Sequence, residues 1–212
     1  ATIDVKDMFF MVPLQEGNQD QFAFTWEGQQ YTFSHLTQGY KHSLTLAHHA
    51  LAQELKQVPL EGGVKIYQYI DDILVGGDQL MLVKTMHDKI IKNLEGLRLT
   101  IPPDKFQSPA AEVKFLGIWW KGSMACIPQD TLSALDQLRM PESKKELQHA
   151  LGLLVFWRKH IPDFSIVAWP LYDLLRKGAL WQWTPMHEEA LQLLIFEATT
   201  HQALGPIHPS DP

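Results

Sequence analysis

Residues 66–77 read Ile66-Tyr-Gln-Tyr-Ile-Asp-Asp-Ile-Leu-Val-Gly-Gly77. Two runs rich in β-branched and aromatic residues flank the acidic pair Asp71-Asp72, which predicts a β-hairpin with the acids at its tip. A buried carboxylate without a partner loses its hydration at a cost, so we expect a cation to meet this pair. Aspartate also favours turns for local reasons. Taken alone, the stretch leaves turn chemistry and a metal site equally open.

Composition places the chain among globular proteins. It has 212 residues, of which 45% are apolar and 20% are charged, enough to bury a sizeable core. Cys126 is the only cysteine, so no internal disulfide can form. We see no signal peptide, and the longest apolar run, Leu151–Trp157, is too short to span a bilayer. We therefore expect a soluble, intracellular chain without a membrane partner.

Charge gives little indication of a partner. The formal net charge is −6, which is no general sign of nucleic-acid binding. Residues 136–180 carry seven basic against five acidic side chains, a difference that a solvated face explains as well as a phosphate-facing surface.

The first part of the chain, up to Ile127, mixes strand and helix patterns. Strand-like alternation and turn residues predict a strand over Ala1–Lys6, an aromatic hairpin over Gln21–Phe33, and a strand over Val113–Trp120 that turns back into Met124–Ile127. Helical spacing predicts a helix over Ser43–Lys56, with Leu46, Ala50, Leu51, Glu54 and Leu55 on one face. It predicts another from Asp78 or Gln79 to Leu94, with Leu82, Met86, Ile90 and Leu94 on one face.

After Pro128 the pattern becomes helical, and we place a domain boundary near this residue. Ser143 and Glu146 have the spacing of a capping box, and Thr184-Pro185 is a typical helix start. We expect helices over Thr131–Leu138, Lys144–Lys159, Phe164–Arg176 (bent near Pro170) and Pro185–Thr199. The chain begins with Ala1 and ends in the loop-like Pro209-Ser-Asp-Pro212, so we expect a piece of a longer polypeptide.

Asp4 lies near the end of the first predicted strand, and two carboxylate-bearing strands side by side would bring Asp4, Asp71 and Asp72 around one point. Carboxylate oxygens are the ligands that Mg²⁺ prefers. Two such ions about 3.5–4 Å apart clamp the attacking and leaving oxygens of a phosphoryl transfer. Rigid strands suit this chemistry, which is mostly positioning and charge stabilisation.

Four ordered motifs resemble those of retroviral reverse transcriptases, in particular gammaretrovirus-like ones. Thr2-Ile-Asp-Val-Lys-Asp-Met-Phe-Phe10 resembles the first catalytic motif, and Leu36-Thr-Gln-Gly-Tyr-Lys-His-Ser43 resembles Leu-Pro-Gln-Gly-Phe-Lys-Asn-Ser. Tyr69-Ile-Asp-Asp72 resembles the Tyr-X-Asp-Asp signature, and Val113-Lys-Phe-Leu-Gly117 resembles the primer grip. The resemblance extends over essentially the whole chain.

The resemblance implies an α+β fold: a polymerase palm, with an antiparallel sheet and helices on one face, followed by a helical thumb. The palm would span residues 1–127, the thumb 128–180, and the start of the connection region 181–212. The family's fingers would precede Ala1, and its RNase H domain would follow Pro212. Pieces of this kind are typical of endogenous retroviral Pol polyproteins, which act in the cytoplasm or the virion.

The resemblance also assigns roles to residues. Asp4, Asp71 and Asp72 would be catalytic and would bind two Mg²⁺ ions, for which Mn²⁺ could substitute. Nucleotide binding would involve Asp7, Phe9, Gln38, Gly39 and Lys105. The ring of Phe9 would exclude a 2′-hydroxyl, although a core aromatic is the alternative. Lys105 would lie near the leaving pyrophosphate, and Phe115, Leu116 and Gly117 would position the primer 3′ end.

The implied function is RNA-directed DNA polymerisation from deoxynucleoside triphosphates on a primed RNA or DNA template, with little activity for the chain without fingers. Thr37, His42 and Leu44 depart from the family's pattern. They keep open the alternative of a non-catalytic endogenous remnant that retains the fold and binds nucleic acid or another subunit. A metal-dependent nuclease is a weaker alternative, because Phe9 and the primer grip have no use in hydrolysis. The sequence does not reveal the oligomeric state.

Overall fold

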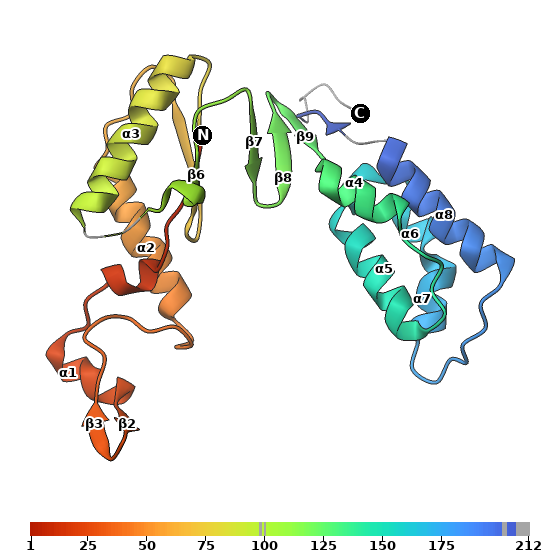
Figure 1. The fold of residues 1–212 in the computed structure, drawn as a ribbon, viewed down its shortest axis with the longest axis horizontal. Coiled ribbons are helices and arrows are strands. Elements are labelled where there is room, and N and C mark those ends of the chain that lie inside the picture. Colours follow the sequence, from red (N-terminus) through yellow and green to blue (C-terminus); the bar gives the residue numbers. More distant parts are fainter. Residues whose placement is uncertain (98, 100, 201–202, 207–212) are drawn as a thin grey trace. The chain divides into compact units, whose positions relative to one another are not determined.

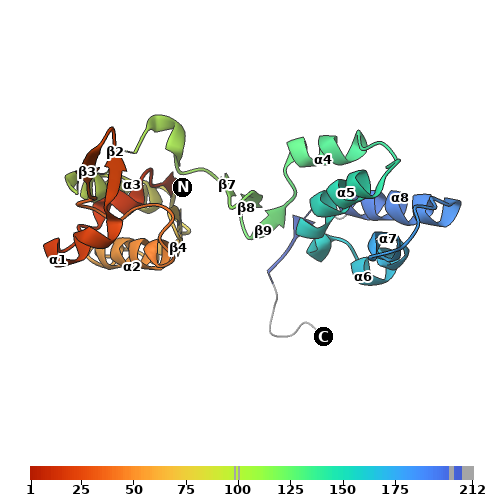
Figure 2. The same cartoon turned by 90° about the horizontal axis from the view of Figure 1, so that it is seen from below.

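The computed structural model describes residues 1–97, 99, 101–200 and 203–206. The chain divides into two compact units, Ala1–Leu116 and Gly117–Pro212 (Figures 1 and 2). The division lies before the hairpin that ends at Ile127, so this hairpin belongs to the second unit, whereas the sequence predicts it in the first part of the chain. No helix in the described ranges has the length and apolarity needed to cross a membrane.

The first unit is built on an antiparallel sheet with the strand order β4-β5-β1-β6. Its strands are β1 (Thr2–Asp4), β4 (Lys65–Tyr69), β5 (Asp72–Gly76) and β6 (Phe106–Gln107). The helices are α1 (Glu16–Gln19), α2 (Ser43–Lys56) and α3 (Leu80–Gly96), with short 3₁₀ turns η1 (Met8–Met11), η2 (Asp20–Phe22) and η3 (Pro103–Lys105). The hairpin β2 (Phe24–Trp26) and β3 (Gln29–Tyr31), and β7 (Glu112–Phe115), complete it.

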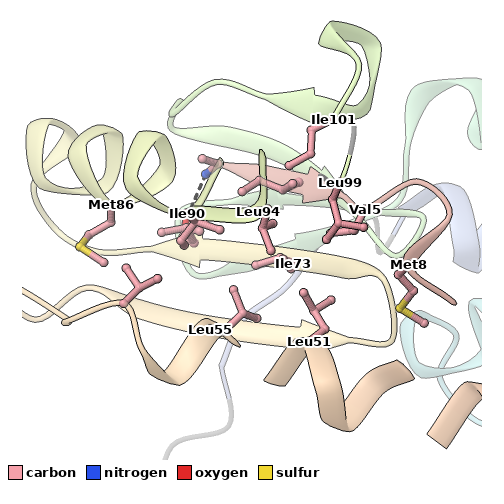
Figure 3. Packing of buried hydrophobic residues seen from close by; sticks show 14 of the residues in the cluster. Val5, Met8, Leu51, Leu55, Ile73, Met86, Ile90, Leu94, Leu99 and Ile101 are labelled. Atoms are coloured by element: carbon pink, nitrogen blue, oxygen red, sulfur yellow. Dashed lines mark hydrogen bonds between the residues drawn. The ribbon is translucent and has the colours of Figure 1, made fainter. Parts of the chain in front are cut away.

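Both long helices cover one face of this sheet. Because side chains alternate along a strand, Ile3 and Val5 of β1 and its extension lie on the same face as Ile73 and Val75 of β5, and all four are buried. α2 and α3 add Leu51, Leu55, Met86, Ile90 and Leu94 to this cluster (Figure 3). The opposite face therefore carries the even-numbered residues of β1 and β5, including the acids.

The predicted face of α2 is partly wrong. Its buried residues are Ser43, Ala47, Leu51 and Leu55, whereas Leu46 is 46% exposed. Ser43 is accommodated because its hydroxyl donates to the carbonyl of Thr37 (2.5 Å). A strictly four-residue repeat thus replaces the broader apolar stripe that the sequence suggested.

The aromatic hairpin is confirmed from Phe24 onward. Phe24 stacks on Tyr31 at a centroid distance of 5.7 Å, and its ring also contacts Phe33 at 5.3 Å. The predicted start at Gln21 is wrong, because η2 ends at Phe22 and the Phe22 ring packs edge-on against Tyr40. The hairpin itself remains exposed on both strands.

The second unit packs helices around their own core. Its elements are β8 (Ile118–Lys121), β9 (Met124–Cys126), α4 (Gln129–Asp136), α5 (Lys144–Phe156), η4 (Arg158–His160), α6 (Phe164–Val167), α7 (Trp169–Leu175), α8 (Pro185–Thr200) and β10 (Ala203–Leu204). β9 pairs with β8 and with β10. The Ser143 cap is confirmed, because its hydroxyl accepts from the Glu146 amide (3.3 Å), but the reciprocal bond differs from a capping box: the Glu146 carboxylate accepts from the amide of Glu142, one residue before the cap (2.9 Å).

Three predicted elements are interrupted. The strand over Val113–Trp120 breaks at Leu116 and Gly117, whose φ angles of 52° and 77° turn the backbone left-handed. α5 ends at Phe156 rather than Lys159, with η4 following, and the predicted Phe164–Arg176 helix breaks at Ala168, before Pro170. The predicted loop at Pro209–Pro212 lies outside the described residues. The α+β prediction, with helices on one face of an antiparallel sheet and a helical part after it, is confirmed.

Candidate catalytic carboxylate site

Tight hydrogen bonding holds the turn between β4 and β5. Ile70 has a φ of 58°, which is costly for a β-branched residue and so needs support from its surroundings. The Gln68 side-chain amide donates to the Ile70 carbonyl (2.9 Å) and to the His48 carbonyl in α2 (3.1 Å). The Val5 amide donates to the Asp71 carbonyl (2.9 Å). Both turn carbonyls are therefore fixed, and so is the position from which the Asp71 side chain leaves.

Strand register brings two of the acids together. Asp4 at the end of β1 lies directly opposite Asp72 at the start of β5, and Asp72 lies opposite Tyr69 of β4. Residues opposite each other in antiparallel strands have side chains on the same face, so both carboxylates leave the sheet away from the helices. Asp71 is the preceding residue in the turn. All three acids are partly exposed.

The charges of the three acids and Lys105 act on one another. Burial raises the pKa of Asp72 above its ordinary value, and the charges of Asp71 and Asp4 raise it further, while Lys105 opposes the shift. The Lys105 ammonium donates to Asp4 Oδ2 at 2.8 Å. This hydrogen bond and the Asp4 charge raise the pKa of Lys105. Four ionisable groups thus influence one another at one end of the inner strands β1 and β5.

The arrangement fits a divalent cation by its chemistry, because the donors are carboxylate oxygens on rigid elements. Among the residues described, however, no three acidic, histidine or cysteine side chains point at one metal-sized position as they stand. The Asp4 carboxylate is instead turned to Lys105. The sequence-predicted trio is therefore brought to one end of the inner strands β1 and β5, with Asp4 engaged by Lys105.

Gln107 joins the carboxylate strand to the segment that leads into Phe115. Its amide nitrogen donates to Thr2 Oγ1 (2.8 Å) and to the Lys114 carbonyl (2.6 Å), and its amide oxygen accepts from the Lys114 amide (2.9 Å). An open cavity of ≈ 210 Å³ lies beside it. Its lining includes Asp4, Asp72, Asp104, Lys105, Lys114, Phe115 and Leu116.

The other predicted nucleotide-binding residues lie outside that cavity lining. Asp7 has a φ of 56° and precedes η1, and Phe9 within η1 is partly buried against the core. Gln38 and Gly39 are exposed before α2, and Gly39 has a φ of 89°, a conformation that favours glycine. η1, which carries Phe9, contacts α2, the helix that Gln38 and Gly39 precede.

Sequence reasoning missed Gln68 and Gln107. Gln68 stands between Tyr67 and Tyr69 at a position whose alternation points to the helix-covered face. A glutamine on the covered face of a strand indicates that its side chain forms hydrogen bonds with buried backbone groups, and this indication was present in the sequence. The sequence around Gln107 gave no such indication. One partner, Thr2, lies far away in the chain, and the other is the backbone of Lys114, which any residue could provide.

Comparison with known proteins gives consistent matches. The family model "Reverse transcriptase (RNA-dependent DNA polymerase)" matches residues 1–120. The chain is 31% identical over 213 residues to the Gag-Pol polyprotein of avian reticuloendotheliosis virus, covering 97% of the chain and 18% of the relative. It is 31% identical over 197 residues to that of koala retrovirus, covering 90% of the chain and 12% of the relative.

Among solved structures, the foamy viral protease-reverse transcriptase in complex with an RNA/DNA hybrid is similar, with a TM-score of 0.80 and 29% identity. The match covers 95% of this chain and 27% of that one. The chain therefore spans a small part of the length of the proteins it matches.

Proposed function

Because this chain belongs to the reverse transcriptase (RNA-dependent DNA polymerase) family, we propose that it forms the catalytic core of an RNA-directed DNA polymerase. In this reaction the primer 3′-hydroxyl attacks the α-phosphate of a deoxynucleoside triphosphate, a new P–O bond forms and pyrophosphate leaves. One observation carries the proposal: Asp4 and Asp72 face each other across β1 and β5, with Asp71 beside them in a braced turn.

Members of this family use divalent metal ions, and we propose that Asp4, Asp71 and Asp72 hold two Mg²⁺, or Mn²⁺ in its place. Bound there, such ions stabilise the charge on the attacking and leaving oxygens. The residues' own contribution is rigidity. The hydrogen bonds to the carbonyls of Ile70 and Asp71 fix the turn, and the β1–β5 register fixes the separation of Asp4 from Asp72.

The nucleotide is proposed to bind along the segment that follows Asp4. Backbone amides near Asp7 would face the triphosphate, Phe9 would lie under the sugar and exclude ribonucleotides, and Gln38 and Gly39 would approach the 3′-hydroxyl. Phe9 packs partly against the core, which leaves a purely structural role as the competing interpretation. Lys105, which lies on the side of Asp4 away from Asp72, would approach the leaving pyrophosphate.

We assign residues 1–127 to the palm, 128–180 to the thumb and 181–212 to the start of the connection region. Phe115, Leu116 and Gly117 would form the primer grip, and the left-handed turn at Leu116-Gly117 would shape it. In the second unit, Lys145, Arg158 and Lys159 are exposed, as tracking of a duplex backbone requires. The partners would be a primed RNA or DNA template and deoxynucleotides, and the place of action the cytoplasm or the virion.

Primer extension by the purified chain, with and without Mg²⁺, tests the proposal. We expect little extension by the chain alone, and any extension should require Mg²⁺, be abolished in Asp71→Asn and be retained in Asp20→Asn, an exposed carboxylate of η2. Because the chain is a small part of its relatives, a parallel assay replaces the corresponding segment of the koala retrovirus polymerase with this chain. Extension that survives Asp71→Asn in both assays would refute the assignment. Duplex binding without extension in both would favour the non-catalytic remnant.

A further inference from the structure

We propose that Lys105 is a built-in counter-ion of the carboxylate cluster, and that a divalent cation must displace its ammonium group from Asp4 in order to bind. This inference rests on the proposed function and adds a competitor to the metal site. The lysine would thereby set the metal concentration at which the site fills.

Topology places Lys105 next to Asp4. β6 pairs antiparallel with β1, with Thr2 opposite Gln107 and Ile3 opposite Phe106. The next position along this register sets Lys105 beside Asp4, just as Asp72 lies beside Asp4 on the other side. Three charged residues thus form a row across β5, β1 and the start of β6.

Backbone contacts hold the lysine in this position. The Lys105 amide donates to the Pro102 carbonyl (2.8 Å), which closes the 3₁₀ turn η3. Two residues further on, the side chain of Gln107 bonds to Thr2 and to both backbone groups of Lys114. The ammonium therefore reaches Asp4 from the last residue of a hydrogen-bonded 3₁₀ turn, directly before β6.

The contact competes directly with metal binding. Lys105 Nζ lies 2.8 Å from Asp4 Oδ2, and Mg²⁺ binds carboxylate oxygens at about 2.0–2.1 Å. A dication on this carboxylate would therefore lie within a few ångströms of the ammonium, and the two charges repel. The present arrangement agrees with this: with Asp4 turned to Lys105, the described acids do not converge on one point.

The Lys105–Asp4 ion pair can compete with a divalent cation for the Asp4 carboxylate, and it can also be displaced by that cation. The side chains of Lys105 and Asp4 are 41% and 35% exposed, so water screens their attraction. A fully buried pair would resist exchange, whereas an exposed pair gives way to a dication that Asp71 and Asp72 also attract. Lys105 thus neutralises part of the acidic cluster without closing the site.

Titration of the purified chain with Mn²⁺, with free Mn²⁺ followed by electron paramagnetic resonance, tests the proposal. We expect Lys105→Met to bind Mn²⁺ about threefold to tenfold more tightly than the wild type, because a screened competitor has been removed. Lys105→Arg keeps the cation and should bind no more tightly than the wild type. Lys84→Met changes the net charge equally on an exposed position of α3, on the other side of the sheet, and should leave the affinity unchanged.

The outcomes separate the two proposals. Equal or weaker Mn²⁺ binding by Lys105→Met, with binding abolished by Asp4→Asn in the wild-type background, overturns the counter-ion role and leaves the metal site intact. Equal tightening by Lys84→Met reduces the effect to net charge and also overturns it. If neither the wild type nor Lys105→Met shows binding that depends on Asp4, the metal site of the proposed function fails. Thermal unfolding of each variant verifies that the fold is retained.

Discussion

Replacing Asp72 by asparagine should stabilise the first unit in the presence of a chelator and remove its stabilisation by Mg²⁺. Asp72 is partly buried and lies opposite Asp4 and next to Asp71. Unit charges about 5 Å apart repel by about 0.8 kcal/mol at the dielectric constant of water and by about 3 kcal/mol at an effective value of 20. Because the site is partly exposed and Lys105 offsets some of this repulsion, we expect a gain near the lower figure, about 1 kcal/mol or about 4 °C.

The pH dependence of the gain follows from the pKa of Asp72. Burial, then the charges of Asp71 and Asp4, raise this pKa above the 3.8 of an unperturbed carboxyl group. As the pH rises past 3.8, the unfolded chain loses the proton that native Asp72 still holds, so the stability of the wild type falls until the raised pKa has been passed. Asp72→Asn lacks this loss. Its advantage over the wild type should therefore be absent below pH 3.8 and complete at neutral pH.

Mg²⁺ should reverse the order of stability. Binding to the native state alone stabilises the wild type by about 1 kcal/mol once free Mg²⁺ reaches about four to five times its dissociation constant. Above that concentration the wild type should unfold at a higher temperature than the variant. Differential scanning fluorimetry with EDTA or increasing Mg²⁺ measures both effects, and Asp20→Asn serves as the matched control. A variant that is no more stable in EDTA, or that Mg²⁺ stabilises as much as the wild type, would refute the reasoning.

Three further changes probe the surrounding structure. Gln107→Leu removes the hydrogen bonds from Gln107 to Thr2 and to the backbone of Lys114 and should lower the free energy of unfolding by about 1–3 kcal/mol, measured by urea denaturation; unchanged stability would show that water replaces these bonds. Leu154→Ala, at a fully buried position of α5, should cost about 2–5 kcal/mol in the same assay, and a smaller loss would contradict the packing of the helical core. Burial lowers the pKa of His160, so the unfolded chain binds a proton at this residue before the native chain does as the pH falls below 6.5. The free energy of unfolding of the wild type should therefore decline below pH 6.5, and His160→Gln should abolish this decline. Identical pH profiles for the two proteins would contradict the burial of His160.

Local patterns in the sequence predicted the long elements well. Ser43–Lys56 contains neither glycine nor proline, and α2 has these same bounds. The acidic turn, with strands on both sides of it, also followed from adjacent residues. By contrast, Leu116 itself gave no sign of the break in the strand, because leucine rarely adopts a φ of 52°. Gly117 was the one local indication of a turn.

Contacts between distant residues account for what the sequence could not provide. The family motifs named Asp4 and Asp72, but their opposition depends on the β1–β5 register, and no local rule fixes which residues of two distant strands align. The Lys105–Asp4 pair joins residues 101 positions apart. Gln68 and Gln107 act on backbone groups that become neighbours only in the folded sheet.

The location of a bound metal ion would show whether Asp4, Asp71 and Asp72 form the metal site. Substoichiometric Mn²⁺ broadens the NMR signals of nearby backbone amides, and the chain, at 24.3 kDa, is within reach of such spectra. We expect the amides of Val5, Asp71, Asp72 and Lys105 to broaden first, and we expect Asp71→Asn to reduce this effect strongly while Asp20→Asn does not. Broadening that centres elsewhere, or that survives Asp71→Asn unchanged, would contradict the assignment of Asp4, Asp71 and Asp72 as the metal site.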